Sequence, residues 1–244
     1  MHVPFPFDLP AYDVVIPCYN RAHVVADAVS SMLAQDPAPR RIVVVDDGSS
    51  DDSAAVIRAL AAAHASVEAM ILPRNGGASH ARNAGVALCE APWVAFLDSD
   101  DIWLPGAARA LLGTTDAVHL DIIVGQFARV EGDSPPMLPE CAWSGGDIRA
   151  ALAGGGVIGP SWSIVRRRTV MAVGGFDPSF HNCNDWDFYT RAAADGARFG
   201  RVEATIALYR TVVGDRLVND HIAGARNAGR VLAHPYFVGP FGLD

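Results

Sequence analysis

The stretch Trp93-Val94-Ala95-Phe96-Leu97-Asp98-Ser99-Asp100-Asp101 passes from a continuous apolar run into three carboxylates. Five apolar residues in a row, two of them aromatic, predict a strand that is buried on both faces. In open α/β sheets, ligands bind at the carboxyl ends of such strands. The sequence therefore predicts an α/β fold with a functional site at the end of this strand.

Asp98 and Asp100 are two residues apart, so in an extended backbone their side chains project to the same side. Carboxylates that lie this close repel each other unless a cation neutralises them. Hard oxygen ligands suit Mg²⁺ or Mn²⁺, above all when a substrate diphosphate completes the coordination shell. One alternative stays open, in which the segment is an Asp/Ser turn and one Asp caps a helix that starts near Pro105.

The composition limits the classes of protein to which the chain can belong. It has 244 residues, of which 50% are apolar, so one α/β domain or two small ones could bury a sizeable core. A formal net charge of -8 argues against a general nucleic-acid binder, which needs clustered Lys and Arg. The 4 cysteines are scattered without a C-x-x-C pair, which disfavours a zinc site or a disulfide framework and fits a reducing cytoplasm.

The chain shows neither a signal peptide nor a membrane span. Residues 1–11 lack the basic start and the long apolar core of a secretory signal. No apolar run approaches the ~20 residues that a membrane helix needs. We expect a cytoplasmic protein, and peripheral association with the inner face of the membrane stays open.

Predicted strands and helices alternate along the first part of the chain. Strands are predicted at 12–17, 41–45, 67–72 and 93–97, and helices at 24–34, 54–63, 78–88 and 105–112. This order predicts a parallel sheet with right-handed crossovers, whose polar loops converge at one edge. The later pattern is less regular, with a strand or strand pair at 119–130, a strand at 161–166, helices at 169–173 and 186–195, a strand at 202–209, and weak signals from 213 onward.

Several short motifs follow one another in order along the chain. They are V-V-I-P-C-Y-N (14–20), V-V-V-D-D-G-S-S-D-D-S (43–53), R-N-G-G-A-S-H-A-R-N-A-G (74–85), F-L-D-S-D-D (96–101), G-G-F-D (174–177) and N-D-W-D-F (184–188). Each motif alone is weak, but the ordered set, over about residues 12–210, resembles family 2 glycosyltransferases of the GT-A fold. The resemblance implies a mostly parallel nucleotide-binding sheet flanked by helices, with a less regular acceptor-binding second half.

The resemblance also implies an activity. A hexosyl group would pass with inversion from a nucleotide-diphosphate sugar, with UDP, dTDP or GDP as the nucleotide, to an acceptor hydroxyl. The acceptor would be a carbohydrate or a lipid-linked molecule in glycan or polysaccharide biosynthesis, and Mn²⁺ or Mg²⁺ would be the cofactor. One domain would cover 1–215, with a donor half at about 12–110 and an acceptor half at 111–215, followed by a C-terminal extension at 216–244.

Site residues follow from the same resemblance, residue by residue. The nucleotide pocket would be lined by Pro17, Tyr19 and Asn20, and the base would be met by Asp46 and Asp47. The residues near the diphosphate, or holding the carboxylates, would be Arg74, Arg82 and Asn83. The D-x-D motif would consist of Asp98, Ser99 and Asp100, with Asp98 and Asp100 on the metal and Asp101 as a further ligand or a structural acid. The catalytic base would be Asp185.

Plainer roles remain for several of these residues. Asp46 and Asp47 could simply open a turn and cap the next helix, and Arg82 could be a solvated helix residue. Asp185 could be the N-cap of the helix expected from Trp186, whereas Asp187 is placed to pair with Arg191 one turn later.

The chain departs from the family pattern at two places. Asn184 stands where the family usually has Glu, so a charge is lost. A His that often follows a late Tyr-Arg pair in the family is missing after Tyr209-Arg210.

Two other classes of protein compete with a glycosyltransferase. A nucleotidyltransferase has a similar sheet and acidic metal site, but it would show a Gly-rich, basic loop where this chain has Pro17-Cys18-Tyr19-Asn20. A non-catalytic nucleotide- or carbohydrate-binding module would have no need to keep Asp98, Asp100 and Asp185 together. The chain also lacks a Walker loop and a G-x-G-x-x-G motif after its first strand.

Overall fold

The computed structural model describes residues 9–114, 116–132, 134–141, 143–155, 158–211 and 221–238. The first part contains β1 (Tyr12–Cys18), α1 (Val25–Leu33), β2 (Arg41–Asp46), α2 (Ser53–Ala63), β3 (Val67–Ile71), α3 (Ala78–Val86), β4 (Trp93–Phe96), β5 (Ile102–Trp103) and α4 (Ala107–Leu112). The predicted strands and helices of this part are confirmed. Only the two-residue strand β5 was not expected, because two residues carry no periodic pattern.

The second part contains η1 (Ala117–His119), β6 (Ile122–Glu131), α5 (Ile148–Ala153), η2 (Pro160–Trp162), β7 (Ser163–Arg166), α6 (Arg167–Ala172), α7 (Asn184–Ala194), β8 (Phe199–Thr211), α8 (His221–Leu232) and α9 (Pro235–Val238). The expected strand or strand pair at 119–130 is one strand, β6. Helix α7 begins two residues before the predicted start. Helix α8 was not predicted, because Gly224 and Gly229 lower its helix propensity.

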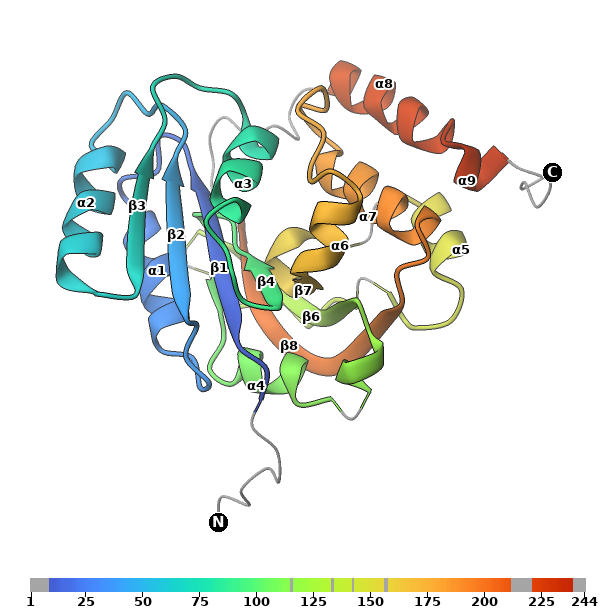
Figure 1. Ribbon diagram of the computed structural model, residues 1–244. Helices are drawn as coiled ribbons and strands as arrows, with labels where there is room; N and C mark the ends of the chain where they lie inside the picture. The colour runs from blue at the N-terminus through green and yellow to red at the C-terminus, as the bar shows by residue number, and fades with distance from the viewer. Residues whose placement is uncertain are drawn as a thin grey trace, which may run out of the picture.

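Eight strands form one sheet in the order β3-β2-β1-β4-β7-β6-β8-β5 (Figure 1). Strands β3, β2, β1 and β4 run parallel to one another, and β6 runs parallel to β8. Strand β7 is antiparallel to β4 and β6, and β5 is antiparallel to β8. The expected α/β fold with a mixed, mostly parallel sheet flanked by helices is confirmed. The parallel order brings the ends of β1, β2 and β4 to one edge.

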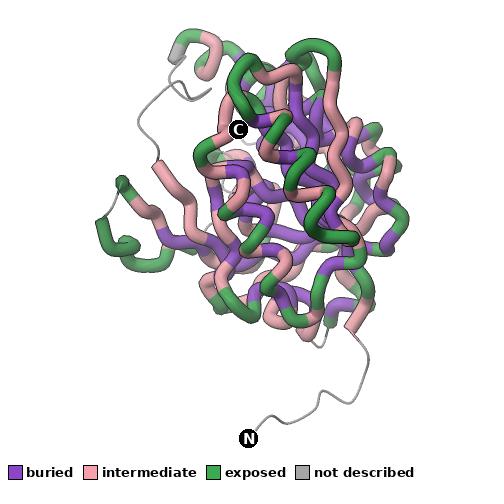
Figure 2. Tube along the Cα trace, turned by 90° about the vertical axis from the view of Figure 1, so that its left-hand side faces the viewer, coloured by how far each residue is buried: buried purple, intermediate pink, exposed green. Residues whose placement is uncertain are grey.

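Helices cover both faces of the sheet. Along β1, Val14 and Ile16 join the buried cluster that includes residues of α1, α2 and α4, whereas Val15 joins the cluster that includes residues of α3, α5, α7, α8 and α9. Figure 2 shows the buried stretches gathered inside the molecule, with exposed stretches around them. Side chains that alternate between two cores fix the strand register, because a one-residue slip would exchange the faces.

Helix α3 lies unusually close to the sheet, and Gly85 makes this possible. A Cβ at Gly85 would lie 2.5 Å from Cγ1 of Val15 on β1, which is closer than real Cβ contacts. Any larger residue would push α3 away from the strand. The close approach places Arg82 and Asn83, one turn earlier on α3, near the end of β4.

A helix able to cross a membrane is not found in the described ranges, where every helix is too short or too polar for that role.

Candidate active site

Arg82, on α3, joins the acidic end of β4 to the start of α7. Its Nη2 donates a hydrogen bond to Oδ1 of Asp98 at 2.5 Å, and its Nη1 donates to Oδ1 of Asn184 at 3.2 Å. The side chain of Arg82 is buried, and its guanidinium lies over the ring of Phe176, 5.1 Å from the ring centroid. A buried cation is tolerated only when it is paired and hydrogen-bonded. The alternative in which Arg82 is a solvated helix residue is therefore wrong, and Asn184 supplies the acceptor where a Glu was expected.

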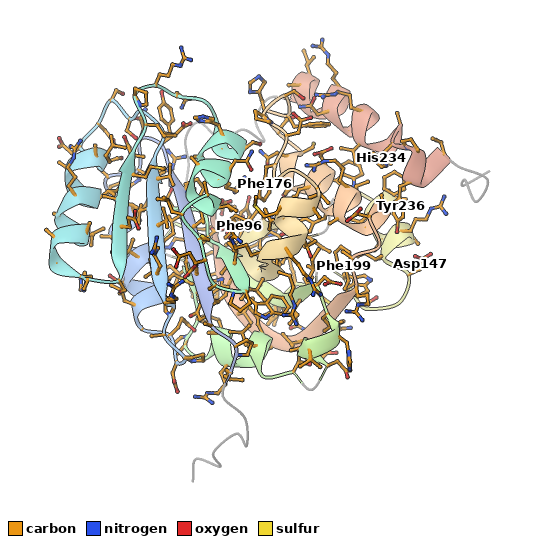
Figure 3. The ribbon with its side chains drawn as sticks, in the orientation of Figure 1. Phe96, Asp147, Phe176, Phe199, His234 and Tyr236 are labelled. Carbon is orange, nitrogen blue, oxygen red and sulfur yellow. The ribbon has the colours of Figure 1, made fainter. Side chains whose placement is uncertain are left out.

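Asn83, the next residue on α3, holds the turn that carries Phe176. Its Nδ2 donates to the carbonyl oxygen of Phe176 at 2.7 Å, and its Oδ1 accepts from the Phe176 N–H at 2.8 Å. The ring of Phe176 is stacked on Phe188 and packs edge-on against Phe96, which lies beside it in Figure 3. Asn83 thus fixes Phe176, and Phe176 supports the guanidinium of Arg82. Both ends of the Asn83 amide are used in this way.

Asp185 lies in the first turn of α7, beside this cluster. Its Oδ1 accepts a hydrogen bond from the Trp186 N–H at 2.8 Å. Burial raises the pKa of Asp185, and the charge on Asp98 adds to the rise, whereas that hydrogen bond and the charge of Arg82 oppose it. A carboxylate with a raised pKa is a stronger base when ionised, which suits proton abstraction.

The residue before α7 is Cys183, so the interpretation of Asp185 as the N-cap of that helix is wrong. The prediction that Asp187 pairs with Arg191 is confirmed, since Nη2 of Arg191 lies 2.7 Å from Oδ2 of Asp187. The neighbouring acids on α7 therefore have different surroundings. Asp187 forms a salt bridge with Arg191 within the helix. Asp185 lies close enough to Arg82 for that charge to lower its pKa.

The turn after β4 gathers three carboxylates. The Asp98 N–H donates to Oγ of Ser161 at 3.2 Å, and Oδ2 of Asp100 lies 3.7 Å from Nε of Arg21. Asp101 is buried and accepts a hydrogen bond from the Arg210 N–H at 3.1 Å. Burial raises the pKa of Asp101 well above its ordinary value, and the charges of Asp98 and Asp100 add to the rise. Ser99, between these acids, is also buried.

The acidic turn fits a hard divalent cation only in part. Among the side chains that the structure describes, no three His, Cys, Asp or Glu residues converge to hold a metal ion by themselves. Asp98 and Asp100 offer hard oxygen donors, and one oxygen of Asp98 is already bonded to Arg82. The repulsion that raises the pKa of Asp101 is the kind that a bound cation relieves. The donor set is therefore chemically suitable, provided that a substrate diphosphate supplies further oxygens.

Asp47 closes the loop after β2 onto the start of α3. Its carboxylate accepts hydrogen bonds from the Gly76 N–H at 3.0 Å and from the Gly77 N–H at 2.7 Å. The side chain is buried, and Nδ1 of His80 lies 3.7 Å from its Oδ1. Asp47 therefore bonds to the start of α3 and does not cap the next helix, α2, whose N-cap is Asp52. Contact with a nucleotide base stays a prediction for it.

Asn20 closes the loop after β1 in a similar way. It has a positive φ of 52°, and its Oδ1 accepts a hydrogen bond from the Ser50 N–H at 2.9 Å. The Asn20 N–H donates to Oγ of Ser49 at 2.9 Å, and Oδ2 of the buried Asp46 accepts from the Ser49 N–H at 3.3 Å. The loops after β1 and β2 therefore bond to each other at the sheet edge where they were predicted to meet.

The remaining predicted residues of the donor side differ in exposure. Pro17 is buried within β1 beside Val45 of β2, whereas Tyr19 is 45% exposed and Arg74 is exposed. Tyr19 is thus open to a ligand from solvent. Contact of the buried Pro17 with a nucleotide stays a prediction.

Sequence reasoning missed several residues of the site. They are Arg21, Ser161 and Phe176, which contact Asp100, Asp98 and Arg82 respectively. Arg21 directly follows the Y-N motif, so its position offered a signal. Nothing in the sequence pairs Ser161 with residue 98, because the two are far apart in the chain and only the β4–β7 pairing brings them together.

Comparison with known proteins identifies the family. The model of glycosyl transferase family 2 matches residues 13–173. The chain belongs to this family. YwdF of Bacillus subtilis (strain 168), an uncharacterized glycosyltransferase, is 30% identical over 199 residues, which are 80% of this chain and 72% of YwdF. The pre-mycofactocin glycosyltransferase of Mycobacterium tuberculosis is 32% identical over 184 residues, which are 71% of this chain and only 39% of that protein.

Solved structures of this glycosyltransferase fold agree with the architecture. S. aureus TarS (residues 1–349) in complex with UDP-GlcNAc superimposes with a TM-score of 0.72 at 18% identity, over 92% of this chain and 67% of TarS. The mannosyltransferase PcManGT from Pyrobaculum calidifontis, in complex with GDP-Man and Mn²⁺, gives a TM-score of 0.68 at 20% identity, over 95% of this chain and 65% of that chain. At these identities the likeness shows the fold.

Proposed function

We propose that this family 2 glycosyltransferase is a metal-dependent inverting enzyme that transfers a hexosyl group from a nucleotide-diphosphate sugar to an acceptor hydroxyl. The observation that carries the proposal is the buried bridge through Arg82. It links Asp98 of the D-x-D motif to Asn184, the neighbour of the proposed base. The residues expected to bind the donor and the residue expected to deprotonate the acceptor are thereby held as one unit.

Asp185 would take the proton of the acceptor hydroxyl as its oxygen attacks the anomeric carbon. The attack breaks the bond from that carbon to the diphosphate oxygen, so a nucleoside diphosphate leaves from the opposite face and the configuration inverts. Burial and the nearby charge of Asp98 raise the pKa of Asp185, which increases its basicity. Arg82 opposes that rise, which keeps a share of Asp185 ionised and able to accept the proton.

Asp98 and Asp100 would hold Mn²⁺ or Mg²⁺ together with the donor. When bound, the cation stabilises the negative charge that develops on the departing diphosphate. The loops with Tyr19, Asn20, Asp46 and Asp47 would bind the nucleoside. The donor complexes of the two fold neighbours support this class of donor, UDP-GlcNAc for TarS and GDP-Man with Mn²⁺ for PcManGT.

These roles imply how the chain is divided into functional parts. Residues 12–110 would form the donor half of one domain and 111–215 the acceptor half, with 216–244 as an extension. Relatives include the succinoglycan biosynthesis protein ExoO of Rhizobium meliloti, 36% identical over 125 residues, 51% of this chain and 35% of ExoO. The name of this relative supports a role in polysaccharide biosynthesis. The acceptor would be a carbohydrate or a lipid-linked molecule, and the reaction would take place in the cytoplasm, at the inner face of the membrane.

Calorimetry of UDP and GDP with Mn²⁺ tests the donor site. Asp98→Asn keeps an oxygen that can accept from Arg82 and removes the negative charge, so it isolates the metal role from the structural one. We expect Asp98→Asn and Asp100→Asn to weaken binding of the preferred nucleotide at least ~10-fold, since each removes a charged ligand. Asp36→Asn, which changes an exposed carboxylate paired with Arg109, is the matched control.

Equal nucleotide affinity in the wild type and both D-x-D variants would contradict the metal site. The products separate the competing class of enzyme. A glycosyltransferase releases a nucleoside diphosphate from the sugar donor, whereas a nucleotidyltransferase running in reverse consumes pyrophosphate. Breakdown of the nucleotide sugar that requires pyrophosphate, or its formation with release of pyrophosphate, would favour the nucleotidyltransferase.

A further inference from the structure

Helix α8 packs on the segment that leads into α7, as Figure 1 shows at the upper right of the molecule. Both helices lie beyond residues 13–173, the part that the family model matches. Three residues of α8 at a spacing of three, Gly224, Asn227 and Arg230, contact this segment. Such spacing places them on one face of the helix.

Asn227 contacts Asn182 from this face. Both side chains are buried, and their amides lie 2.6 Å apart. Nδ2 of Asn227 also lies 3.2 Å from the backbone carbonyl oxygen of Asn182 as a donor. In the other orientation of its amide, the Asn182 side chain instead donates to the carbonyl oxygen of Ala223 at 3.3 Å and accepts from the Gly224 N–H at 2.9 Å, so either orientation ties it to α8. Buried amides are costly unless they are hydrogen-bonded, so this pairing fixes residue 182 against the helix.

Arg230 holds the beginning of the same segment. Its Nη1 donates to the carbonyl oxygen of Ser179 at 3.1 Å, and its Nη2 donates to the Ser179 Oγ at 2.7 Å. Its guanidinium lies over the ring of Phe180, 3.7 Å from the centroid. Nη1 of Arg230 also donates to Oδ1 of Asn227 at 3.2 Å, which ties the two contacts together.

The end of the segment has an unusual backbone conformation. Cys183, the residue before α7, has a positive φ of 57°. A non-glycine residue adopts this left-handed conformation only where its surroundings hold it. The next two residues are Asn184, which accepts from Arg82, and Asp185. Only Cys183 and Asn184 separate Asp185 from Asn182, the residue that α8 contacts.

We infer that Asn227 is a positioning residue for Asp185, acting through Asn182 and the turn at Cys183. The inference rests on the proposed function, because it takes Asp185 as the base. It also makes α8 a working part of the catalytic domain and not a separate extension. Loss of the Asn182–Asn227 contact should displace Asp185 from the acceptor, and a displacement of about 1 Å can lower the rate ~100-fold. Donor binding should persist, because Asp98 is held by Arg82 and Ser161, and the loops that would bind the nucleoside bond to each other.

Four variants test this chain of contacts: Asn227→Leu, Asn182→Ala, the double variant, and Arg226→Ala as an exposed control on the same helix. The measurements are kcat and KM with UDP-GlcNAc or GDP-mannose and Mn²⁺, and the Kd for UDP or GDP with Mn²⁺. We expect Asn227→Leu to lower kcat at least ~10-fold with an unchanged Kd. The double variant should be no slower than the slower single one, because the two residues act as one unit.

Hydrogen exchange of the amides at 183–187, without donor, gives a readout that needs no turnover. Faster exchange there in Asn227→Leu, with unchanged exchange in β1–β4, is expected. Unchanged exchange, an unchanged kcat, or a Kd that weakens as much as kcat falls would overturn the inference. If Asp185→Asn loses turnover and Asn227→Leu keeps it, only this inference is overturned. If Asp185→Asn keeps its turnover, the assignment of Asp185 as the base is overturned, and this inference with it.

Discussion

The loops after β1 and β2 and the cluster around Arg82 are held together in different ways. In the loops, Asn20 bonds to Ser50 and Asp47 to Gly77, each about 30 residues away in the chain. In the cluster, Arg82 bonds to Asn184 and Asn83 to Phe176, across 102 and 93 residues. The two loops are therefore built from neighbouring units of the parallel sheet. The cluster around Arg82 exists only after both halves of the chain have packed.

This difference has a consequence for how each region responds to mutation. A change in a donor loop should act on that loop, because its partners are close in the chain. A change in the cluster should act on both halves, because its contacts to Asn184 and Phe176 cross between them. Three variants, taken from the largest expected effect to the smallest, test whether the two regions differ in this way.

Asp185→Asn should have the largest effect, on turnover alone. Asn has nearly the shape of Asp but cannot accept the proton of the acceptor, so transfer should fall by roughly 100-fold or more. Nucleotide binding with Mn²⁺ should persist, because the donor loops are held independently of α7. Steady-state kinetics and calorimetry measure the two effects separately.

Asp187→Asn is the matched control for this experiment, since Asp187 pairs with Arg191 on the same helix. It should keep its turnover even if its stability falls. Near-normal transfer by Asp185→Asn would remove Asp185 from the mechanism. The cluster around Arg82 would then contribute to the stability of the fold and not to catalysis.

Gly175→Ala should have the next largest effect, on both stability and turnover. Gly174 and Gly175 have nearly equal positive φ values of 74° and 75°, so alanine strains the backbone alike at both positions. At Gly175 the added Cβ would also lie 2.4 Å from Oδ1 of Asn83, whereas at Gly174 nothing lies within 4 Å. We expect a cost of about 1 kcal/mol at Gly174 and roughly 1–3 kcal/mol more at Gly175, measured by urea unfolding.

Turnover adds a second test to this pair of variants. Only Gly175→Ala should lower kcat, because only that change displaces Asn83 and the Phe176 ring under Arg82. Equal losses of stability and turnover in both variants would show that backbone strain alone matters at this turn. The contact between Asn83 and Phe176 would then contribute little to stability or to turnover.

Asp101→Asn should have the smallest effect, an increase in stability that depends on pH. The pKa of Asp101 is raised above its ordinary 3.8 in the folded protein, so between these two pKa values the folded state binds more protons than the unfolded state. Stability of the wild type should therefore fall as pH rises through this window. The variant should be more stable above it, by about 1.4 kcal/mol for each unit of the rise, and equal to the wild type at acidic pH.

Thermal unfolding with a chelator present, from acidic to mildly alkaline pH, measures this difference without a bound cation. Hydrogen bonds to Asp101 from the Ser161 side chain and the Arg210 N–H oppose the rise of its pKa, and the side-chain oxygen of an asparagine can still accept them. A variant that is less stable than the wild type at every pH would show that Asp101 is held as a charged acid. The acidic turn would then be stabilised in the same way as the donor loops.

The parallel half of the sheet was predictable from the sequence alone. Its buried apolar runs and helical spacing are local patterns, and tertiary packing did not override them. The sequence also placed the acidic turn at a strand end, since parallel strands must end at one edge. The family motifs then named Arg82, Asn83 and Asp185 but left their partners open. Arg82 and Asn83 come from the same motif, yet the motif does not indicate that they bond to different partners. Arg82 bonds to the carboxylate of Asp98, and Asn83 bonds to the turn at Phe176.

The partners of these residues became known only from the tertiary structure. Ser161 meets Asp98 because β7 pairs antiparallel with β4, and Phe176 supports Arg82 because its turn docks on α3. Helix α8, weakly encoded because of its glycines, takes its place through Asn227 and Arg230 against the segment before α7. Such contacts join residues far apart in the chain, and no local pattern of side chains specifies which distant residue will close them.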